Sequence, residues 1–159
     1  MARPKSVLDI GCAYGFTVGR LNILGIPSKG IDISEYALSK ADDEVRPFLV
    51  LGSATHLPFE DKSFDFIFSS GVLEHLEGDA LRESVDEIIR VGNQGLIGVS
   101  VLDDITTHEG DDVSHQTILK LAEWRALFPS EFVIISDSES SWRRYLTFLL
   151  YDKCIKEIR

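Results

Sequence analysis

The chain has 159 residues, with 26 acidic side chains against 16 basic ones and a formal net charge of −10. A composition of 44% hydrophobic and 26% charged residues excludes disordered and fibrous proteins, and the length predicts a single domain over residues 1–159. The acidic balance disfavours nucleic acid as a partner, because phosphate binding depends on Lys and Arg, and no apolar run approaches the ~18 residues that span a membrane.

Short apolar runs alternate with helical patterns along the whole chain. Buried strands are predicted at residues 6–10, 29–33, 48–51, 64–69, 96–101, 132–135 and 145–151. Helices are predicted at 15–24 with Phe16, Leu21 and Leu24 facing inward, at 35–41, at 79–91, and before Pro129 with Leu121, Trp124, Leu127 and Phe128 facing inward. Strands that flank a helix should be parallel, whereas the last two leave no room for a helix and should be antiparallel. The predicted fold class is α/β: a doubly wound, Rossmann-like, mostly parallel seven-stranded sheet with an antiparallel C-terminal strand.

A glycine turn follows the first strand. Gly11 allows a sharp turn and Gly15 lets the next helix pack closely, at the sheet edge where open parallel sheets bind ligands. Asp32 ends the second strand, 21 residues after Gly11, where a carboxylate can accept both hydroxyls of a ribose. The alternatives are a generic strand-to-helix turn and an aspartate that only caps the next helix.

The turn differs from the dinucleotide-binding fingerprint. Ala13 and Phe16 stand where G-x-G-x-x-G requires glycine, and Asp9 places an acid where a pyrophosphate would be repelled but an ammonium group attracted. The sequence therefore predicts a nucleoside-like ligand with a cationic tail.

Four segments together resemble the class I S-adenosylmethionine-dependent methyltransferases, in particular their small single-domain members. They are residues 7–15 (VLDIGCAYG), 30–34 (GIDIS), 57–65 (LPFEDKSFD) and 72–76 (VLEHL), with a weaker similarity at 122–128. The resemblance covers about residues 6–101 in order and implies S-adenosylmethionine as the cofactor.

The resemblance also implies roles for the matching positions. Gly11 and its neighbours Cys12, Ala13, Tyr14 and Gly15 would surround the methionine end, with Asp9 orienting the amino group directly or through water. Asp32 would hold the ribose, Ile33 would lie against the adenine, and the Ala54 amide would face the ring. The remaining cofactor-binding positions implied are Ser70, at the end of the fourth strand, and Ser53, which replaces the family's usual carboxylate. Cys12 is expected to pack rather than act as a nucleophile.

His75 is the candidate general base for acceptors that must lose a proton. Its alternative is a packing histidine, and the neighbouring Glu74 either orients the imidazole or faces solvent. Methyl transfer from a sulfonium depends mainly on holding the acceptor in line, so a base is not required for every acceptor.

The loop at 102–116 is rich in acids and histidines and follows the fifth strand. It is expected either to form a substrate wall that favours cationic or neutral acceptors, testable by neutralising Asp111 and Asp112, or to be a solvated acidic loop. Its spacing matches no compact metal motif, so no metal is predicted.

The first strand starts near residue 6, so no N-terminal segment is expected to cover the acceptor site. The site would be open, completed by the 102–116 loop, or completed by a homodimer or another partner chain. The leading hypothesis is a methyltransferase acting on a small-molecule acceptor. The alternatives are a non-catalytic cofactor-binding or partner subunit and a nucleotide-dependent oxidoreductase. With two cysteines and no disulfide framework, the protein is expected to be cytoplasmic.

Overall fold

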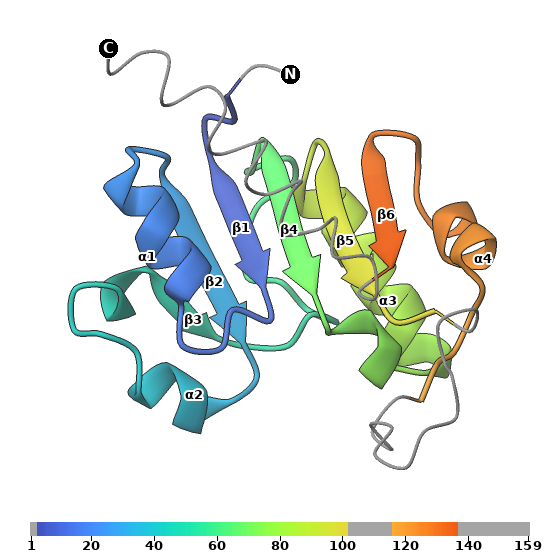
Figure 1. Ribbon diagram of the computed structural model, residues 1–159, viewed down its shortest axis with the longest axis horizontal. Helices are drawn as coiled ribbons and strands as arrows, with labels where there is room; N and C mark the ends of the chain where they lie inside the picture. Colours follow the sequence, from blue (N-terminus) through green and yellow to red (C-terminus); the bar gives the residue numbers. More distant parts are fainter. Residues whose placement is uncertain (1–2, 102–115, 137–159) are drawn as a thin grey trace.

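The computed structural model describes residues 3–101 and 116–136, which form a parallel sheet with helices on both faces (Figure 1). In spatial order the strands are β3 (Leu49–Leu51), β2 (Ser28–Asp32), β1 (Val7–Ile10), β4 (Phe66–Ser70), β5 (Gly95–Val99) and β6 (Phe132–Ser136). Every neighbouring pair in this six-stranded sheet is parallel. The strand order reverses between β1 and β4, which is the switch point of a doubly wound sheet.

The predicted α/β fold is confirmed for the described residues. The six described strands fall where the sequence predicts them, with ends that differ by up to two residues. The predicted antiparallel strand at 145–151 lies outside the described residues, so it stays a prediction.

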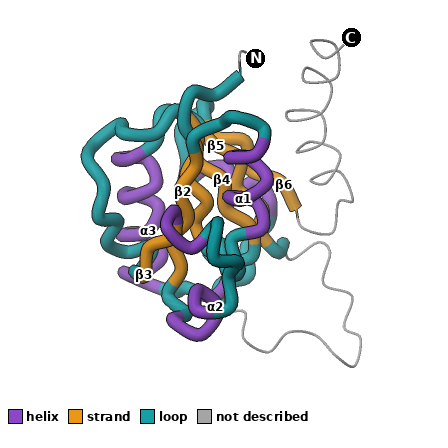
Figure 2. Tube along the Cα trace, turned by 90° about the vertical axis from the view of Figure 1, so that its left-hand side faces the viewer, coloured by secondary structure: helices purple, strands orange, loops and turns teal. Residues whose placement is uncertain are grey.

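The helices are α1 (Phe16–Ile23), α2 (Glu35–Ser39), α3 (Gly78–Val91) and α4 (Leu121–Ala126), with short 3₁₀ turns η1 (Arg46–Phe48) and η2 (Leu73–His75). Helices α1 and α3 lie on opposite faces of the sheet, as the two views in Figures 1 and 2 show. No helix within 3–101 and 116–136 is long and apolar enough to cross a membrane.

Side chains that point alternately to the two faces of the sheet fill the core on both sides. On the α1 side, Leu21 packs with Val7 and Phe66, whereas on the α3 side Ile88 packs with Leu8 and Ile67. Strands β1, β4 and β5 thus send successive apolar side chains to opposite layers.

Two inward-facing predictions are wrong. Phe16 is 75% exposed, because α1 begins at Phe16 and its core-facing positions are Val18 and Leu21. Leu127 is 37% exposed because α4 ends one residue earlier, while the predicted burial of Trp124 is confirmed at 0% exposure.

Candidate functional site

The turn after β1 is held against the end of β2. The amides of Gly11 and Cys12 donate to the Ile31 carbonyl at 2.8 and 3.2 Å. Gly11 has φ +79°, and a Cβ there would lie 2.2 Å from Cγ2 of Val72, so only glycine fits. The glycine thus lets the turn pack closely against Val72, and Gly11 and Ala13 themselves line a cleft at the sheet edge.

Asp32 connects this turn to the end of β2. Its Oδ2 accepts from the Ala13 amide and its Oδ1 from the Ser34 amide, both at 2.8 Å. Each carboxylate oxygen has about two acceptor sites, so each retains capacity for a further donor. Two adjacent ribose hydroxyls would supply two donors, one for each oxygen of this carboxylate. The Ser34 hydroxyl accepts from the Ala37 amide, so Ser34 caps α2 and Asp32 does more than cap a helix.

Asp9, on β1, and Cys12, within the turn, are both buried. Asp9 is only 4% exposed, and burial raises the pKa of its carboxyl to about 7, opposed by a hydrogen bond with the Thr17 side chain and assisted by the charge of Asp32. Burial, and then the charges of Asp9 and Asp32, raise the pKa of the Cys12 thiol to about 12. A thiol with this pKa is protonated at neutral pH, which agrees with packing rather than nucleophilic attack.

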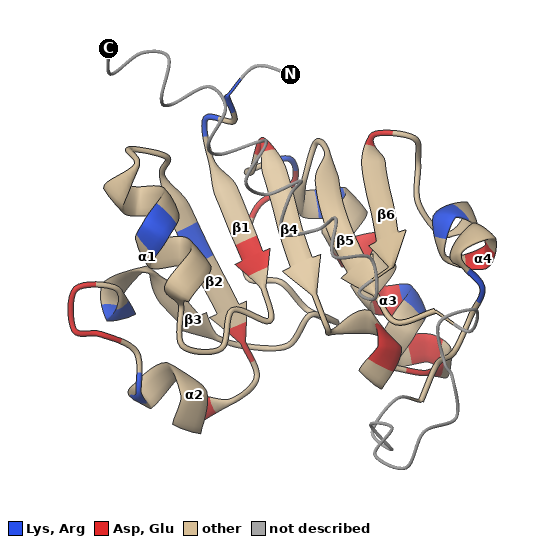
Figure 3. Ribbon diagram, in the orientation of Figure 1, with Lys and Arg blue, Asp and Glu red and all other residues tan. Residues whose placement is uncertain are grey.

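A cleft of about 430 Å³ runs along the carboxyl ends of β1, β2 and β4. This volume lies within the ~300–1,000 Å³ typical of ligand sites. Seven residues predicted from the sequence line it: Gly11, Ala13, Asp32, Ile33, Ser53, Ala54 and His75. The other predicted residues, Asp9, Cys12, Tyr14, Gly15 and Ser70, are not among its lining residues. Figure 3 shows acidic residues at the ends of β1 and β2, beside this edge.

Apolar surface is available on the β2 side of the cleft. Ile33, immediately after Asp32, is 77% exposed. The Ser53 hydroxyl is shared with its own turn: it accepts from the Thr55 amide at 3.2 Å and lies 2.8 Å from the Thr55 hydroxyl oxygen. Ser53 therefore offers a ligand a weaker acceptor than a carboxylate would.

His75 lies on η2, directly after β4, and lines the opposite end of the cleft. Glu74 beside it is 1% exposed, and its Oε1 accepts from the Ser100 amide at 3.1 Å. The expectation that Glu74 faces solvent is therefore wrong, because this carboxylate bonds to the residue that follows β5.

Sequence reasoning missed several cleft residues: Ile10, Ile31, Gly52, Gly71, Val72 and Leu76. Gly71 has φ +69° and follows β4 as Gly11 follows β1, so the rule that ligands lie at strand ends could have found it. Ile10 and Ile31 look like ordinary core residues in the sequence, and only the packing reveals that they reach the cleft.

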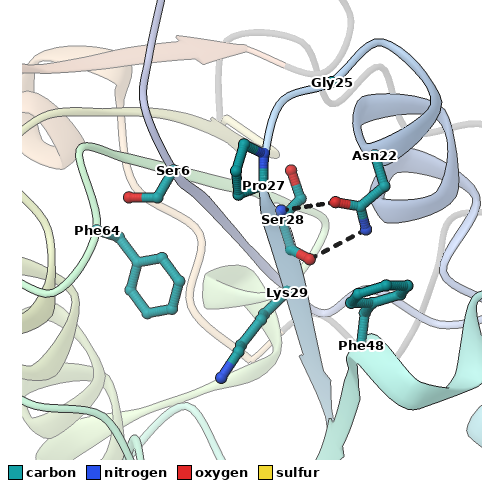
Figure 4. A pocket seen from close by; sticks show the side chains of 8 residues that line it. All are labelled: Ser6, Asn22, Gly25, Pro27, Ser28, Lys29, Phe48 and Phe64. Carbon is teal, nitrogen blue, oxygen red and sulfur yellow. Dashed lines mark hydrogen bonds between the residues drawn. The ribbon is translucent and has the colours of Figure 1, made fainter.

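A second hollow of about 460 Å³ lies at the opposite, amino end of β2 (Figure 4). Phe48 and Phe64 form parts of its wall, and the Asn22 side chain there pairs with the backbone of Ser28 at 2.8 and 3.2 Å. Its lining contains one charged side chain, Lys29, and no convergent set of titratable groups. The carboxyl-edge cleft is therefore the better candidate for chemistry.

Within residues 3–101 and 116–136, no group of three or more His, Cys, Asp or Glu side chains is arranged to hold a metal ion. The acidic loop residues Asp103, Asp104, His108, Glu109, Asp111, Asp112 and His115 lie outside the described residues. The predicted substrate wall thus stays a prediction.

The switch-point cleft, the glycine turn and the carboxylate that ends β2 together define an α/β domain that binds a nucleoside-containing cofactor. Residues 8–97, more than half of the chain, match the family model described as a methyltransferase domain. The chain belongs to this methyltransferase family, whose cofactor is S-adenosylmethionine.

Individual relatives support this assignment. The chain is 33% identical over 101 residues to a norajmaline N-methyltransferase of Rauvolfia serpentina (58% of this chain, 34% of the relative). It is 34% identical over 116 residues to a tRNA U34 carboxymethyltransferase of Photobacterium profundum (68% of this chain, 34% of the relative). A solved S-adenosylmethionine-dependent methyltransferase from Methanosarcina mazei is 25% identical, with a TM-score of 0.52, over 59% of this chain and 50% of the other. The chain thus spans about a third of the length of the two curated relatives.

Proposed function

We propose that this chain transfers a methyl group from S-adenosylmethionine to a small, neutral or cationic acceptor at the His75 end of the cleft. The observation that supports this most is the cleft itself, which places Asp32, the Gly11 turn and His75 along one sheet edge. The nucleoside would occupy the β2 end, and the acceptor would approach from the β4 end.

The residues present fit this cofactor. The Asp32 carboxylate retains acceptor capacity for the ribose hydroxyls, and the exposed Ile33 offers an apolar surface for the adenine. Gly11 and Ala13 of the turn line the cleft where the methionine end would lie, and the buried carboxyl of Asp9 on β1 would attract the ammonium group. When bound, the cofactor supplies a methyl group already activated by a sulfonium. Ser53 and Ala54 would contact the adenine edge, with weaker selection by Ser53 because its hydroxyl is also bonded to Thr55.

His75 is proposed as the general base for acceptors that lose a proton during the reaction. It lines the cleft at the β4 end, where an imidazole nitrogen can take a proton from a bound acceptor. For an amine acceptor that is already neutral, His75 would instead help to orient the nucleophile.

Charge supports a small acceptor. The net charge of −10 opposes a polyanion such as RNA. One relative is an N-methyltransferase named for norajmaline, while another is named for tRNA, so both kinds of acceptor belong in the test.

The test has two stages. Titration calorimetry with S-adenosylhomocysteine, the demethylated cofactor, should show binding to the chain, and absence of binding would contradict the proposal. Radiolabelled S-adenosylmethionine should then transfer label to a member of a panel of amines and phenols, with bulk tRNA as the polyanionic comparison. Transfer to tRNA alone would overturn the small-molecule assignment.

The second candidate is a subunit that binds the cofactor but requires another chain, a homodimer mate or a different protein, to complete the acceptor site. Its basis is that the chain spans only about a third of the length of two of its relatives, and that the family match lies over the segments proposed to bind the cofactor. Cofactor binding without turnover in the isolated chain would favour this reading, whereas turnover by the isolated chain would exclude it.

A further inference from the structure

Glu74 is a buried carboxylate with an unusual position. It lies on η2, one residue before the proposed base His75, and is 1% exposed. Burying a carboxylate is costly unless it receives hydrogen bonds, and its Oε1 accepts from the Ser100 amide at 3.1 Å. The side chain thus joins the turn after β4 to the residue just beyond β5.

Ser100, whose amide donates to the Glu74 carboxylate, is itself held in place. Ser100 follows β5, and its carbonyl accepts from Nε1 of Trp124 at 3.1 Å. Trp124 is fully buried against the sheet core. Glu74 is therefore attached to a rigid point in the core rather than to a surface loop.

The backbone of the same turn receives further bonds. The Glu74 carbonyl accepts from the amides of Gln116 and Thr117 at 2.8 and 3.0 Å, and the Thr117 hydroxyl donates to the Leu76 carbonyl. Residues on both sides of the 102–115 segment, Ser100 and Gln116–Thr117, are thus hydrogen-bonded to one residue beside the cleft. His75 and Leu76, which line the cleft, lie within this bonded turn.

We propose that Glu74 is a positioning residue, whose carboxylate holds η2 against Ser100 so that His75 and Leu76 keep their places in the cleft wall. This rests on the proposed role of the cleft in cofactor and acceptor binding. The Ser100 amide requires a hydrogen-bond acceptor at the Oε1 position, and a carboxamide oxygen also supplies one.

The test compares Glu74→Ala, which removes the acceptor, with Glu74→Gln, which keeps an acceptor oxygen. The exposed neighbour Glu77 gives the matched control, Glu77→Gln. Thr117→Val removes only the hydroxyl bonded to Leu76, so it probes the other restraint on the same turn. Glu74→Asp, which shortens the side chain, takes the place of Glu74→Ala should that variant fail to fold. The readouts are the imidazole resonances of His75 by NMR, with His56 as internal reference, and S-adenosylhomocysteine affinity by calorimetry.

Glu74→Ala should shift the His75 resonances and weaken S-adenosylhomocysteine binding at least fivefold. Glu74→Gln should keep both the resonances and the affinity close to wild type. Thr117→Val should give smaller changes of the same kind as Glu74→Ala. Glu77→Gln should change neither. A folded Glu74→Ala protein with wild-type His75 resonances and affinity would overturn the proposal, as would a Glu74→Gln variant as defective as Glu74→Ala. If the wild type binds no S-adenosylhomocysteine, the proposed function fails, but the His75 resonances of the free variants still test Glu74 separately.

Discussion

The Asp32 carboxylate accepts a hydrogen bond from the Ala13 amide at 2.8 Å, so the acid that ends β2 also holds the turn that follows β1. One side chain therefore shapes the turn and faces the cleft.

Asp32→Ala should weaken S-adenosylhomocysteine binding by ~10-fold to 100-fold. Hydrogen bonds to a charged group contribute about 1.5–3 kcal/mol each, and the variant also frees the Ala13 and Ser34 amides. Calorimetry measures this loss, and Asp86→Ala, an exposed acid on α3, should bind like wild type. Equal affinity of Asp32→Ala and wild type would remove the ribose assignment.

Ala13 has φ +46°, a left-handed conformation that costs most L-residues about 1–2 kcal/mol. Ala13→Gly should therefore stabilise the fold by about 0.5–1 kcal/mol, after allowing for the greater freedom of glycine in the unfolded chain. Urea unfolding measures the change. Ala37→Gly, in α2, is the matched control and should destabilise by a similar amount. A destabilised Ala13→Gly would contradict the inferred strain.

The raised pKa of Asp9 makes stability depend on pH. The folded carboxyl titrates near pH 7 and the unfolded one near 3.9, so between these values the folded state binds more protons. The contribution of Asp9 to the free energy of unfolding must therefore fall as pH rises from about 4 to 7 and stay level above. Asp9→Asn removes this effect. The free energy of unfolding of Asp9→Asn, measured relative to wild type, should therefore rise by roughly 2–4 kcal/mol as the pH increases over that range. A difference independent of pH would contradict the assignment.

Cofactor binding should release a proton from Asp9. A bound ammonium group lowers the pKa of a nearby carboxyl, so a site that is partly protonated near neutral pH loses its proton. The calorimetric enthalpy of S-adenosylhomocysteine binding at pH 6.5 should accordingly differ between phosphate and Tris buffers. Asp9→Asn should lessen that difference, and an unchanged buffer dependence would argue against contact between Asp9 and the ligand.

Arg90 fixes the segment that follows the Ser53–Ala54 part of the cleft. It donates to the carbonyls of Leu57 and Phe59 and pairs with Glu87 at 2.6 and 2.8 Å. Arg90→Met should destabilise the protein by about 2–3 kcal/mol at pH 7, because it leaves half-buried acceptors unpaired. The control Arg82→Met breaks a pair with Asp79 that is largely exposed and should cost no more than about 0.5 kcal/mol.

The Arg90 effect also has a defined pH dependence. The side-chain hydrogen bond with Arg90 holds the pKa of Glu87 below its ordinary value. The stabilisation is therefore complete above the unfolded pKa near 4.3 and is lost as pH falls through the lower folded pKa. The gap between wild type and Arg90→Met should narrow below pH 4. A gap that widens there would show that Glu87 is not the partner that matters.

Period and spacing were enough to predict the described strands and two of the cleft residues, Gly11 and Asp32, whereas Ile33, Ser53 and Ala54 were implied by the family resemblance. The apolar runs locate the six described strands, and the distance from Gly11 to Asp32 places both at one edge of the sheet. These features depend on local pattern and on the topology of parallel strands, which the sequence contains directly.

Long-range packing could not be predicted in the same way. The burial of Glu74 depends on Ser100, 26 residues later, and no local pattern distinguishes it from an exposed acid. The exposure of Phe16 likewise depends on where α1 begins relative to the sheet edge. Such errors concern residues whose surroundings come from distant parts of the chain.

A crystal structure with S-adenosylhomocysteine tests the central claim most directly. We expect the ribose hydroxyls on Asp32, the adenine against Ile33, and His75 facing the space beside the sulfur. A nucleoside bound elsewhere, or a His75 side chain turned away from the sulfur, would contradict the account.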